Sequence, residues 1–284
     1  LIWTARREYF YWVEKLGDKA VNAAKKVNYF FVPPQNRFIG LIKEKVPWCI
    51  SRDRVWGTPL PIWVCSKCNE KIGLFSRSEI IDNAIKLPDG HNFELHRPWI
   101  DKVIIKCPKC GGSAHREHFV LDTWHNSGAA PFASFTDEEY EKLVPTEFLT
   151  EGIDQTRGWA YTLLIEHLIL TGKTEAPYKA FLFQGHILDE NGNKMSKSQG
   201  NMVDGIETLN SNAVYIMRFY MMWKSSPIDS LNFSLKEMST RPYQVFSTLY
   251  HLHLFLLQNS SYDNFDSKNH SIQWASEKSL LSGV

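Results

Sequence analysis

Residues 148–188 read FLTEGIDQTRGWAYTLLIEHLILTGKTEAPYKAFLFQGHIL, and this stretch decides the fold. Residues 148–150 suit a short strand, residues 152–156 suit a loop, and residues 157–171 repeat apolar side chains at helical spacing. Residues 180–188 are a second strand candidate. A strand, a helix and a strand with short joins predict a βαβ unit, with parallel strands and a right-handed crossover.

Directly after the second predicted strand come Lys194, Met195, Ser196, Lys197 and Ser198, which we call the lysine loop. Turn-forming residues flank it on both sides, which predicts a mobile loop. Two ammonium groups and two hydroxyl groups suit a polyphosphate that must be gripped and then released. Taken alone, these five residues also fit a plain solvated basic loop, so the rest of the chain has to decide.

The ends of the two predicted strands carry polar residues. Residues 152–155 follow the first strand, and residues 184–186 lie in the second. Because parallel α/β sheets bind ligands beyond the carboxyl ends of their strands, both segments should share one rim of the sheet. The lysine loop is therefore predicted to face residues 151–155.

The composition is that of an ordinary globular protein. Of the 284 residues, 43% are hydrophobic and 22% are charged, which excludes a disordered chain. The formal net charge of +1 excludes a surface that is basic throughout, but it leaves room for a local basic strip. No apolar run reaches the roughly 18 residues of a membrane span and no signal-peptide pattern is present, so we expect no membrane association and a cytoplasmic location. The chain starts in mid-pattern without Met, from which we expect a piece of a longer protein.

Four of the five cysteines form two CxxC pairs, Cys65 with Cys68 and Cys107 with Cys110. Two such pairs let four thiolates converge in a tetrahedron, which suits a structural zinc ion without a catalytic role. The 38 residues between the pairs, 69–106, exceed the usual zinc-ribbon spacing of about 15–20, which predicts an insertion there. Redox CxxC motifs and reduced, unmetallated cysteines are the alternatives. His115 and His118 are alternate ligands, and Cys49 is expected to be a packed small hydrophobe.

Both ends of the chain carry helical patterns. Residues 9–26 have helical spacing, whereas Pro33 with Pro34 and Pro59 with Pro61 should forbid a continuous helix where they occur. Residues 213–223 are apolar and Met-rich, and residues 239–258 are amphipathic. Both of these later segments predict helices.

The lysine loop resembles the signature loop of class I aminoacyl-tRNA synthetases, and four further segments match that family in order. Residues 50–61 look like the strand that re-enters the catalytic domain after the editing insertion, and residues 121–128 look like the family's Trp-Phe-Asp-Ser-Gly segment. Residues 151–159 are similar to the adenylate-binding loop of isoleucyl enzymes, and residues 184–189 depart slightly from the family's His-Gly pattern. The isoleucyl family is the nearest, because valyl enzymes share the cysteine pairs and the lysine loop but resemble residues 151–159 less.

The resemblance implies an α/β fold: the second half of a Rossmann-like nucleotide-binding fold, with a zinc-ribbon-like insertion and a C-terminal helical region. It divides the chain into four predicted domains. Residues 1–60 form the segment that leads from the editing insertion back into the catalytic domain, and residues 61–120 form the zinc-binding module. Residues 121–205 form the second Rossmann half with the lysine loop. Residues 206–284 form the helical stem-contact region and the start of the anticodon-binding domain.

The resemblance also implies roles for single residues. Lys194 and Lys197 would neutralise charge on departing pyrophosphate. Trp124 and Trp159 would form the pocket for the isoleucine side chain. The alternative is that they pack in the core, as most tryptophan side chains do. The residues that would bind ATP or the adenylate are Glu151, Gly152, Asp154, Gln155, Gly185, His186, Met195, Ser196, Lys197 and Ser198. Asp154 has a structural alternative, because it precedes the predicted helix and could cap free amides there.

The activity that the resemblance implies is ATP-dependent activation of isoleucine as an aminoacyl-adenylate, followed by transfer to tRNA-Ile. The implied partners are L-isoleucine, tRNA-Ile and ATP with Mg²⁺, and the parent enzyme is expected to be a monomer. A fragment of a valyl enzyme and a zinc-containing RNA-binding module without adenylate chemistry are the alternatives. Nothing in the chain matches the family's His-x-Gly-His signature, so we expect the chain alone not to form isoleucyl-adenylate.

Overall fold

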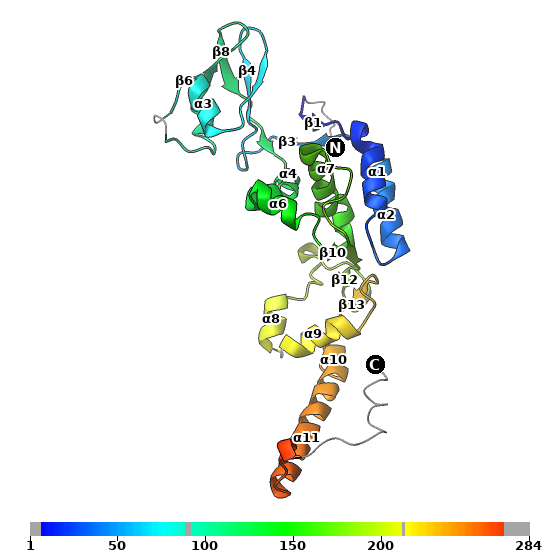
Figure 1. Ribbon diagram of the computed structural model, residues 1–284. Helices are drawn as coiled ribbons and strands as arrows, with labels where there is room; N and C mark the ends of the chain where they lie inside the picture. Colours follow the sequence, from blue (N-terminus) through cyan, green and yellow to red (C-terminus); the bar gives the residue numbers. More distant parts are fainter. Residues whose placement is uncertain (1–6, 89–91, 212–213, 270–284) are drawn as a thin grey trace. The chain divides into compact units, whose positions relative to one another are not determined.

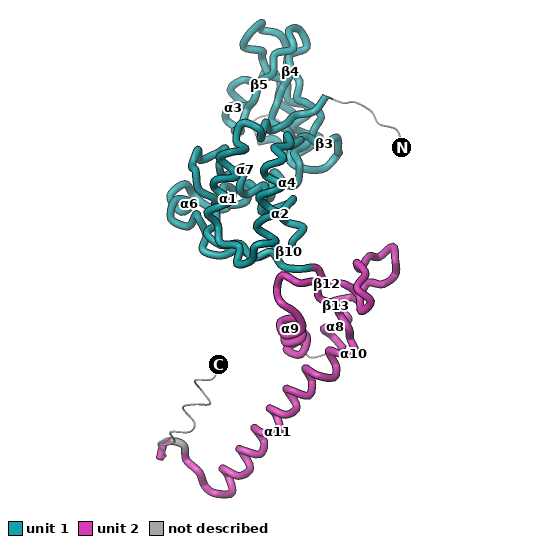
Figure 2. Tube along the Cα trace, turned by 90° about the vertical axis from the view of Figure 1, so that its right-hand side faces the viewer, with its two compact units in different colours: residues 1–185 teal, residues 186–284 magenta. Residues whose placement is uncertain are grey.

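The structure is a computed structural model that describes residues 7–88, 92–211 and 214–269 (Figure 1). The chain divides into two compact units, residues 1–185 and residues 186–284, which we call the N-terminal unit and the C-terminal unit (Figure 2). The division falls between Gly185 and His186. These two predicted nucleotide-binding residues therefore belong to different units.

The predicted βαβ unit is confirmed in the N-terminal unit. Its elements are β10 (Leu149–Gly152), the short 3₁₀ helix η3 (Ile153–Arg157), α7 (Trp159–Thr171) and β11 (Phe181–Gln184). The strands β10 and β11 run parallel, with a register that starts at Leu149 opposite Phe181 and ends at Gly152 opposite Gln184. The second strand is shorter than predicted, because it is interrupted after Gln184. It resumes as β12 (Ile187–Leu188) in the C-terminal unit, where it pairs with β13 (Leu231–Asn232).

The helix α7 forms the centre of the N-terminal unit. Leu164, Ile165 and Leu168 are at most 1% exposed, and they belong to one core cluster with Phe181 and Phe183 of β11. Burying a side chain the size of leucine contributes about 1.5–3 kcal/mol, so this helix holds much of the stability of the unit. At its C-terminal end Gly172 adopts a left-handed conformation with φ +70°, which ends the helix without a Cβ penalty.

The first fifty residues differ from the sequence prediction in two places. The elements are β1 (Phe10–Tyr11), η1 (Val13–Leu16), α1 (Gly17–Lys25), α2 (Val32–Lys43) and β2 (Trp48–Cys49). The predicted helix over 9–26 therefore begins with a strand, because β1 pairs antiparallel with β2. The prediction that Pro33 and Pro34 prevent a helix was wrong. They lie in the first turn of α2, where the missing backbone N–H would have had no partner inside the helix.

The two cysteine pairs belong to a small antiparallel sheet with its own core. Its elements are β4 (Ile62–Cys65), β5 (Lys71–Gly73), α3 (Arg77–Asn83), β6 (Ala84–Lys86), η2 (Ile100–Lys102), β7 (Ile104–Lys106) and β8 (Ser113–Arg116). The strand order is β5-β4-β8-β7-β6, and Trp63 lies fully buried at the centre, where its Nε1 donates to the carbonyl of Val103 at 3.2 Å. The predicted insertion between the pairs contains β5, α3, β6, η2 and β7.

A short strand pair and three helices connect this sheet to the βαβ unit. They are β3 (Ser51–Arg52), β9 (Val120–Leu121), α4 (Thr123–Gly128), α5 (Ala130–Ser134) and α6 (Asp137–Leu143). The strand β3 pairs antiparallel with β9, with Ser51 opposite Leu121. This pairing sets the position at which α4 begins.

The C-terminal unit is mostly helical. Besides β12 and β13 it contains η4 (Lys197–Gln199), α8 (Gly205–Ser211), α9 (Val214–Trp223), α10 (Leu235–Met238), α11 (Arg241–Tyr262) and η5 (Ser267–Asn269). Its core gathers Ile216, Tyr220, Leu231, Phe233 and Met238. The helices predicted over 213–223 and 239–258 are confirmed as α9 and α11. Among the described residues, no helix has both the length and the apolar character needed to cross a bilayer.

Candidate functional site

A buried carboxylate ties the start of α4 to the segment that follows α2. Asp122, 5% exposed, caps α4 by accepting from the backbone N–H of Trp124 at 3.4 Å. Its Oδ2 also accepts from Trp48 Nε1 at 3.0 Å and from Arg52 Nη2 at 2.8 Å. A hydrogen-bonded ion pair of this kind fixes the orientation of both segments. Trp48 and Asp122 were not among the predicted site residues.

Trp124 lies directly over the N-terminal end of α7. A Cβ placed on Gly158 would lie 2.9 Å from Trp124 Cη2 and 2.4 Å from Gln155 Oε1, so any larger residue would force these side chains to shift. Gln155 Oε1 accepts from the backbone N–H of Trp159 at 3.0 Å and so satisfies the first free amide of α7. The alternative that Asp154 caps this helix was wrong. Its exposed carboxylate accepts instead from Gln155 Nε2 at 2.9 Å.

A second buried carboxylate, that of Glu166 on α7, lies beside His125 of α4. His125 Nδ1 lies 3.1 Å from Glu166 Oε1, and it lies 3.4 Å from the hydroxyl of Tyr11. Burial raises the pKa of Glu166, whose side chain is 2% exposed. A Cβ on Gly128 would lie 2.8 Å from this carboxylate, which shows how closely the two helices approach. His125 stands where the family pattern has Phe, so this pairing departs from the pattern.

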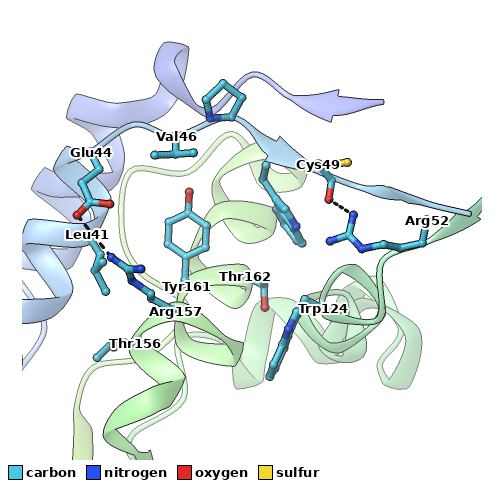
Figure 3. A pocket seen from close by; sticks show the side chains of 12 residues that line it. Leu41, Glu44, Val46, Cys49, Arg52, Trp124, Thr156, Arg157, Tyr161 and Thr162 are labelled. Carbon is cyan, nitrogen blue, oxygen red and sulfur yellow. Dashed lines mark hydrogen bonds and ion pairs between the residues drawn. The ribbon is translucent and has the colours of Figure 1, made fainter. Parts of the chain in front are cut away.

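Trp124 also lines a cavity of about 300 Å³ (Figure 3). The cavity walls come from α2, residues 46–52, η3 and α7, and Tyr161 of α7 points toward Val46. Burial raises the pKa of Tyr161 to about 12, so its hydroxyl is protonated at neutral pH. Trp159 is absent from this lining, and its Nε1 donates to the carbonyl of Ser127 at 3.0 Å. The two predicted pocket tryptophans therefore both contact the α4–α7 junction, but only Trp124 faces this cavity.

The carboxyl ends of β10 and β11 meet as the sequence predicts. Gly152 lies opposite Gln184 in the register, so residues 151–155 and Gly185 lie at the same end of the two strands. The side chains of Glu151 and Asp154 are exposed there. A Cβ on Gly152 would lie 2.6 Å from Asp154 Oδ1, so the glycine lets this carboxylate fold back over the strand end. This end of the strands thus presents the carboxylates of Glu151 and Asp154 next to Gly152, which has no side chain.

The lysine loop has a hydrogen-bonded backbone and two exposed lysine side chains. Ser196 Oγ accepts from the backbone N–H of Gln199 at 3.3 Å and caps η4, and Gly200 has a left-handed φ of +67°. Lys194 and Lys197 are exposed, and neither ammonium group has an ion-pair partner in the described part of the chain. His186, Met195 and Ser198 belong to the same unit as these lysines. Two unpaired cations on one loop are available to an anion.

The four cysteine sulfurs converge on one point. The Sγ atoms of Cys65, Cys68, Cys107 and Cys110 all lie within 4.8 Å of one another. Cys65 Sγ is 3.5 Å from Cys110 Sγ, and Cys68 Sγ is 3.7 Å from Cys107 Sγ. A disulfide requires about 2.05 Å, whereas a tetrahedral zinc site with Zn–S bonds of about 2.3 Å has sulfur–sulfur edges of roughly 3.8 Å. The donor set therefore fits a metal ion.

Both turns that carry these cysteines have the same backbone form. Asn69 donates its N–H to the carbonyl of Cys65 at 3.0 Å, and Gly111 donates to the carbonyl of Cys107 at 2.9 Å. Both donors are left-handed, with φ of +56° and +72°. Amides of Cys68 and Lys67 lower the pKa of the Cys65 thiol to about 6, whereas burial and hydrogen bonds to the other three cysteines raise the pKa of Cys68 to about 12. The alternate ligands His115 and His118 are not in the cluster, and neither is Cys49.

Comparisons with known proteins connect these features to one family. The family model described as tRNA synthetases class I (I, L, M and V) matches residues 2–234. Curated relatives include the isoleucine–tRNA ligase of Picrophilus torridus, 37% identical over 90% of this chain and 25% of its own length. The corresponding ligase of Pyrobaculum aerophilum is 38% identical over 99% of this chain and 29% of its own length. The chain thus spans about a quarter of the length of the curated relatives it matches.

Solved structures support the same fold. A ternary complex of Agrobacterium radiobacter K84 LeuRS with tRNA and LeuAMS aligns with a TM-score of 0.60 at 22% identity, covering 78% of this chain and 29% of that chain. Mycobacterium tuberculosis methionyl-tRNA synthetase bound by methionyl-adenylate aligns with a TM-score of 0.53 at 18% identity, covering 84% of this chain and 38% of that chain. At these identities the likeness concerns the fold.

Proposed function

The chain belongs to the class I tRNA synthetase family, and from that premise we propose that it supplies part of an isoleucine–tRNA ligase. In the proposed reaction, the carboxylate of isoleucine attacks the α-phosphate of ATP, and the acyl group of the adenylate then passes to tRNA-Ile. The observation that carries the proposal is the α4–α7 junction, where Trp124, Gln155 and Trp159 gather around Gly158.

The α4–α7 junction suits the side chain of the amino acid. The indoles of Trp124 and Trp159 offer broad apolar surfaces, and Gly158 lets Trp124 approach the start of α7 closely. Apolar walls accept a branched alkyl group and exclude larger rings by their shape. Such a pocket distinguishes isoleucine from valine by about 1–3 kcal/mol, a general limit for which isoleucine enzymes are the standard illustration.

The strand rim suits the polar part of the adenylate. We assign Glu151, Gly152, Asp154, Gln155 and Gly185 to it, and we separately assign His186 to nucleotide binding. Carboxylates accept hydrogen bonds from an ammonium group and from ribose hydroxyls. The two exposed carboxylates at this end of the strands support this assignment.

The lysine loop suits the phosphates. Lys194 and Lys197 would neutralise the charge that develops on pyrophosphate as it leaves, with Met195, Ser196 and Ser198 contacting ATP and Mg²⁺ shared with its phosphates. Phosphoryl chemistry of this kind depends on positioning and on charge more than on proton transfer. Losing one such cation should raise the barrier by about 3–4 kcal/mol, by analogy with a preorganised oxyanion donor.

The cysteine cluster suits zinc with a structural role. Four thiolates close the coordination shell, which leaves no position for a substrate. We keep the four-domain division at residues 60, 120 and 205 as part of the proposal, with a helical tRNA-contacting region at the C-terminal end and a monomeric parent enzyme. The cytoplasm is the proposed location.

Calorimetric titration of the chain with two sulfamoyl adenosine analogues, isoleucyl and valyl, tests the proposal. We expect the isoleucyl analogue to bind about tenfold or more tightly than the valyl one. Trp124→Ala should abolish that preference, and Trp56→Ala, which alters a tryptophan that is 75% exposed, should leave it intact. Equal affinities, tighter valyl binding or no binding of either analogue would contradict the assignment. ATP–pyrophosphate exchange by the chain alone should be absent.

A further inference from the structure

Residues 189–201, which include the lysine loop, are held together by the carboxylate of Asp189, in an arrangement that we call the closure. Asp189, 9% exposed, directly follows β12 and accepts four hydrogen bonds. Its Oδ1 accepts from the backbone N–H groups of Asn191 at 3.0 Å and Asn193 at 2.7 Å. Its Oδ2 accepts from Asn193 Nδ2 at 3.3 Å and from Asn201 Nδ2 at 3.0 Å. The carboxylate therefore joins the two ends of the segment 189–201.

The side chain of Asn201 also forms hydrogen bonds with the backbone of the lysine loop. Its Nδ2 donates a second hydrogen bond to the carbonyl of Lys194 at 3.2 Å, and its Oδ1 accepts from the backbone N–H of Ser196 at 3.0 Å. The backbone on both sides of Met195 is thus held by one amide group. Both N–H groups of that amide are used, and the carboxylate determines which way the amide points.

We propose that Asp189 and Asn201 are positioning residues, which fix the backbone at 194–196 so that Lys194 and Lys197 meet a polyphosphate in one arrangement. This inference rests on the proposed function of the lysine loop. A loop that is ordered before its ligand arrives does not lose that conformational freedom on binding, so a fixed backbone raises affinity without a new contact. Neither Asp189 nor Asn201 needs to touch the phosphates for this effect.

The four donors around Asp189 make a carboxylate obligatory. An asparagine at this position presents its NH₂ group to two donors in either orientation of the amide. It therefore loses two of the four hydrogen bonds. Asp189→Asn also removes a negative charge near the lysine loop. Charge alone would then tighten the binding of an anion, whereas loss of the closure would weaken it. The two effects have opposite signs.

Titration of the chain with inorganic pyrophosphate separates the two effects. We expect Asp189→Asn to weaken binding by about tenfold, the usual effect of losing a hydrogen bond to a charged group. Glu190→Gln is the matched control, because it removes the same charge from the neighbouring exposed carboxylate, and it should bind pyrophosphate as tightly as the unaltered chain or more tightly. The positioning role is overturned if Asp189→Asn binds pyrophosphate as tightly as Glu190→Gln.

Hydrogen exchange at the Ser196 amide separates failure of this inference from failure of the proposed function. In the unaltered chain this amide should be protected, and Asp189→Asn should speed its exchange by at least about tenfold. If Ser196 is protected but the unaltered chain does not bind pyrophosphate, the closure exists and the phosphate role of the lysines is wrong. If exchange is equally fast in both chains, the closure itself is absent and the positioning role is wrong, whatever the affinity.

Discussion

The buried His167 should make the N-terminal unit sensitive to acid. This side chain of α7 is 2% exposed, and its Nδ1 is hydrogen-bonded to the hydroxyl of Tyr140 at 2.6 Å. Burial, followed by the ammonium group of Lys173, lowers the pKa of His167 to about 4, so the folded protein holds this ring neutral. In the unfolded chain the same ring takes up a proton near pH 6.5.

The sign and size of the effect follow from these two values. Because the unfolded state binds the proton more readily, stability is complete above about pH 6.5 and declines as the pH falls toward 4. Each pH unit in that window costs about 1.4 kcal/mol, which amounts to about 3 kcal/mol in all and about 2 kcal/mol between pH 7 and pH 5. A change of that size is a large part of the stability of an ordinary domain.

Urea unfolding followed by tryptophan fluorescence at pH 7 and pH 5 measures this loss. His167→Asn retains a hydrogen-bond acceptor for Tyr140 but cannot take up a proton, so its loss of stability over this interval should be about 2 kcal/mol smaller than that of the unaltered chain. Any cavity left by the smaller side chain costs the same at both pH values and cancels in the comparison. His253→Asn, which alters an exposed histidine of α11, should behave as the unaltered chain. Equal pH dependence in His167→Asn and the unaltered chain would refute the reasoning.

Three further substitutions test other parts of the structure. Leu164→Ala should destabilise the N-terminal unit by about 2–5 kcal/mol in urea unfolding, since the side chain is fully buried, and a cost below 1 kcal/mol would contradict the packing described. Gly158→Ala places a Cβ 2.4 Å from Gln155 Oε1 and 2.9 Å from Trp124, so binding of the isoleucyl analogue should weaken by about tenfold or more in calorimetry. Unchanged affinity would show that Trp124 is not held at this site. Cys68→Ser should lower the zinc content after dialysis, measured by mass spectrometry, and a full equivalent of retained zinc would exclude this cysteine as a ligand.

The parts of the fold that were predictable rest on local periodicity. The helical spacing of residues 157–171 and the short joins around it are sufficient to define a βαβ unit, and β10, α7 and β11 confirm it. The Pro33-Pro34 prediction failed because it treated proline as a helix breaker at every position. The first turn of a helix leaves its N–H groups unpaired in any case, and there proline is tolerated.

The parts of the site that were missed depend on contacts between distant residues. The motif resemblance pointed to Trp124, but Trp48 and Arg52 reach the same place only because both bond to Asp122, which is 74 and 70 positions away. No local sequence pattern predicts such a contact. The first backbone N–H of α7 is bonded by Gln155 and not by Asp154. Both side chains are close enough in sequence to reach it, and the path of the backbone through η3 determines which one does.

The cysteine cluster has a consequence for how this protein could change over evolutionary time. The strands β4 and β8 are neighbours, with Cys65 opposite Ala114, so strand register brings the two CxxC turns together. The segment between β5 and β7 can therefore change in length without moving a sulfur, provided that the strand register and the packing around Trp63 survive. A search pattern with a fixed gap would overlook such variants, whereas a pattern that requires only the two turns, each with a left-handed Asn or Gly after it, would recover them.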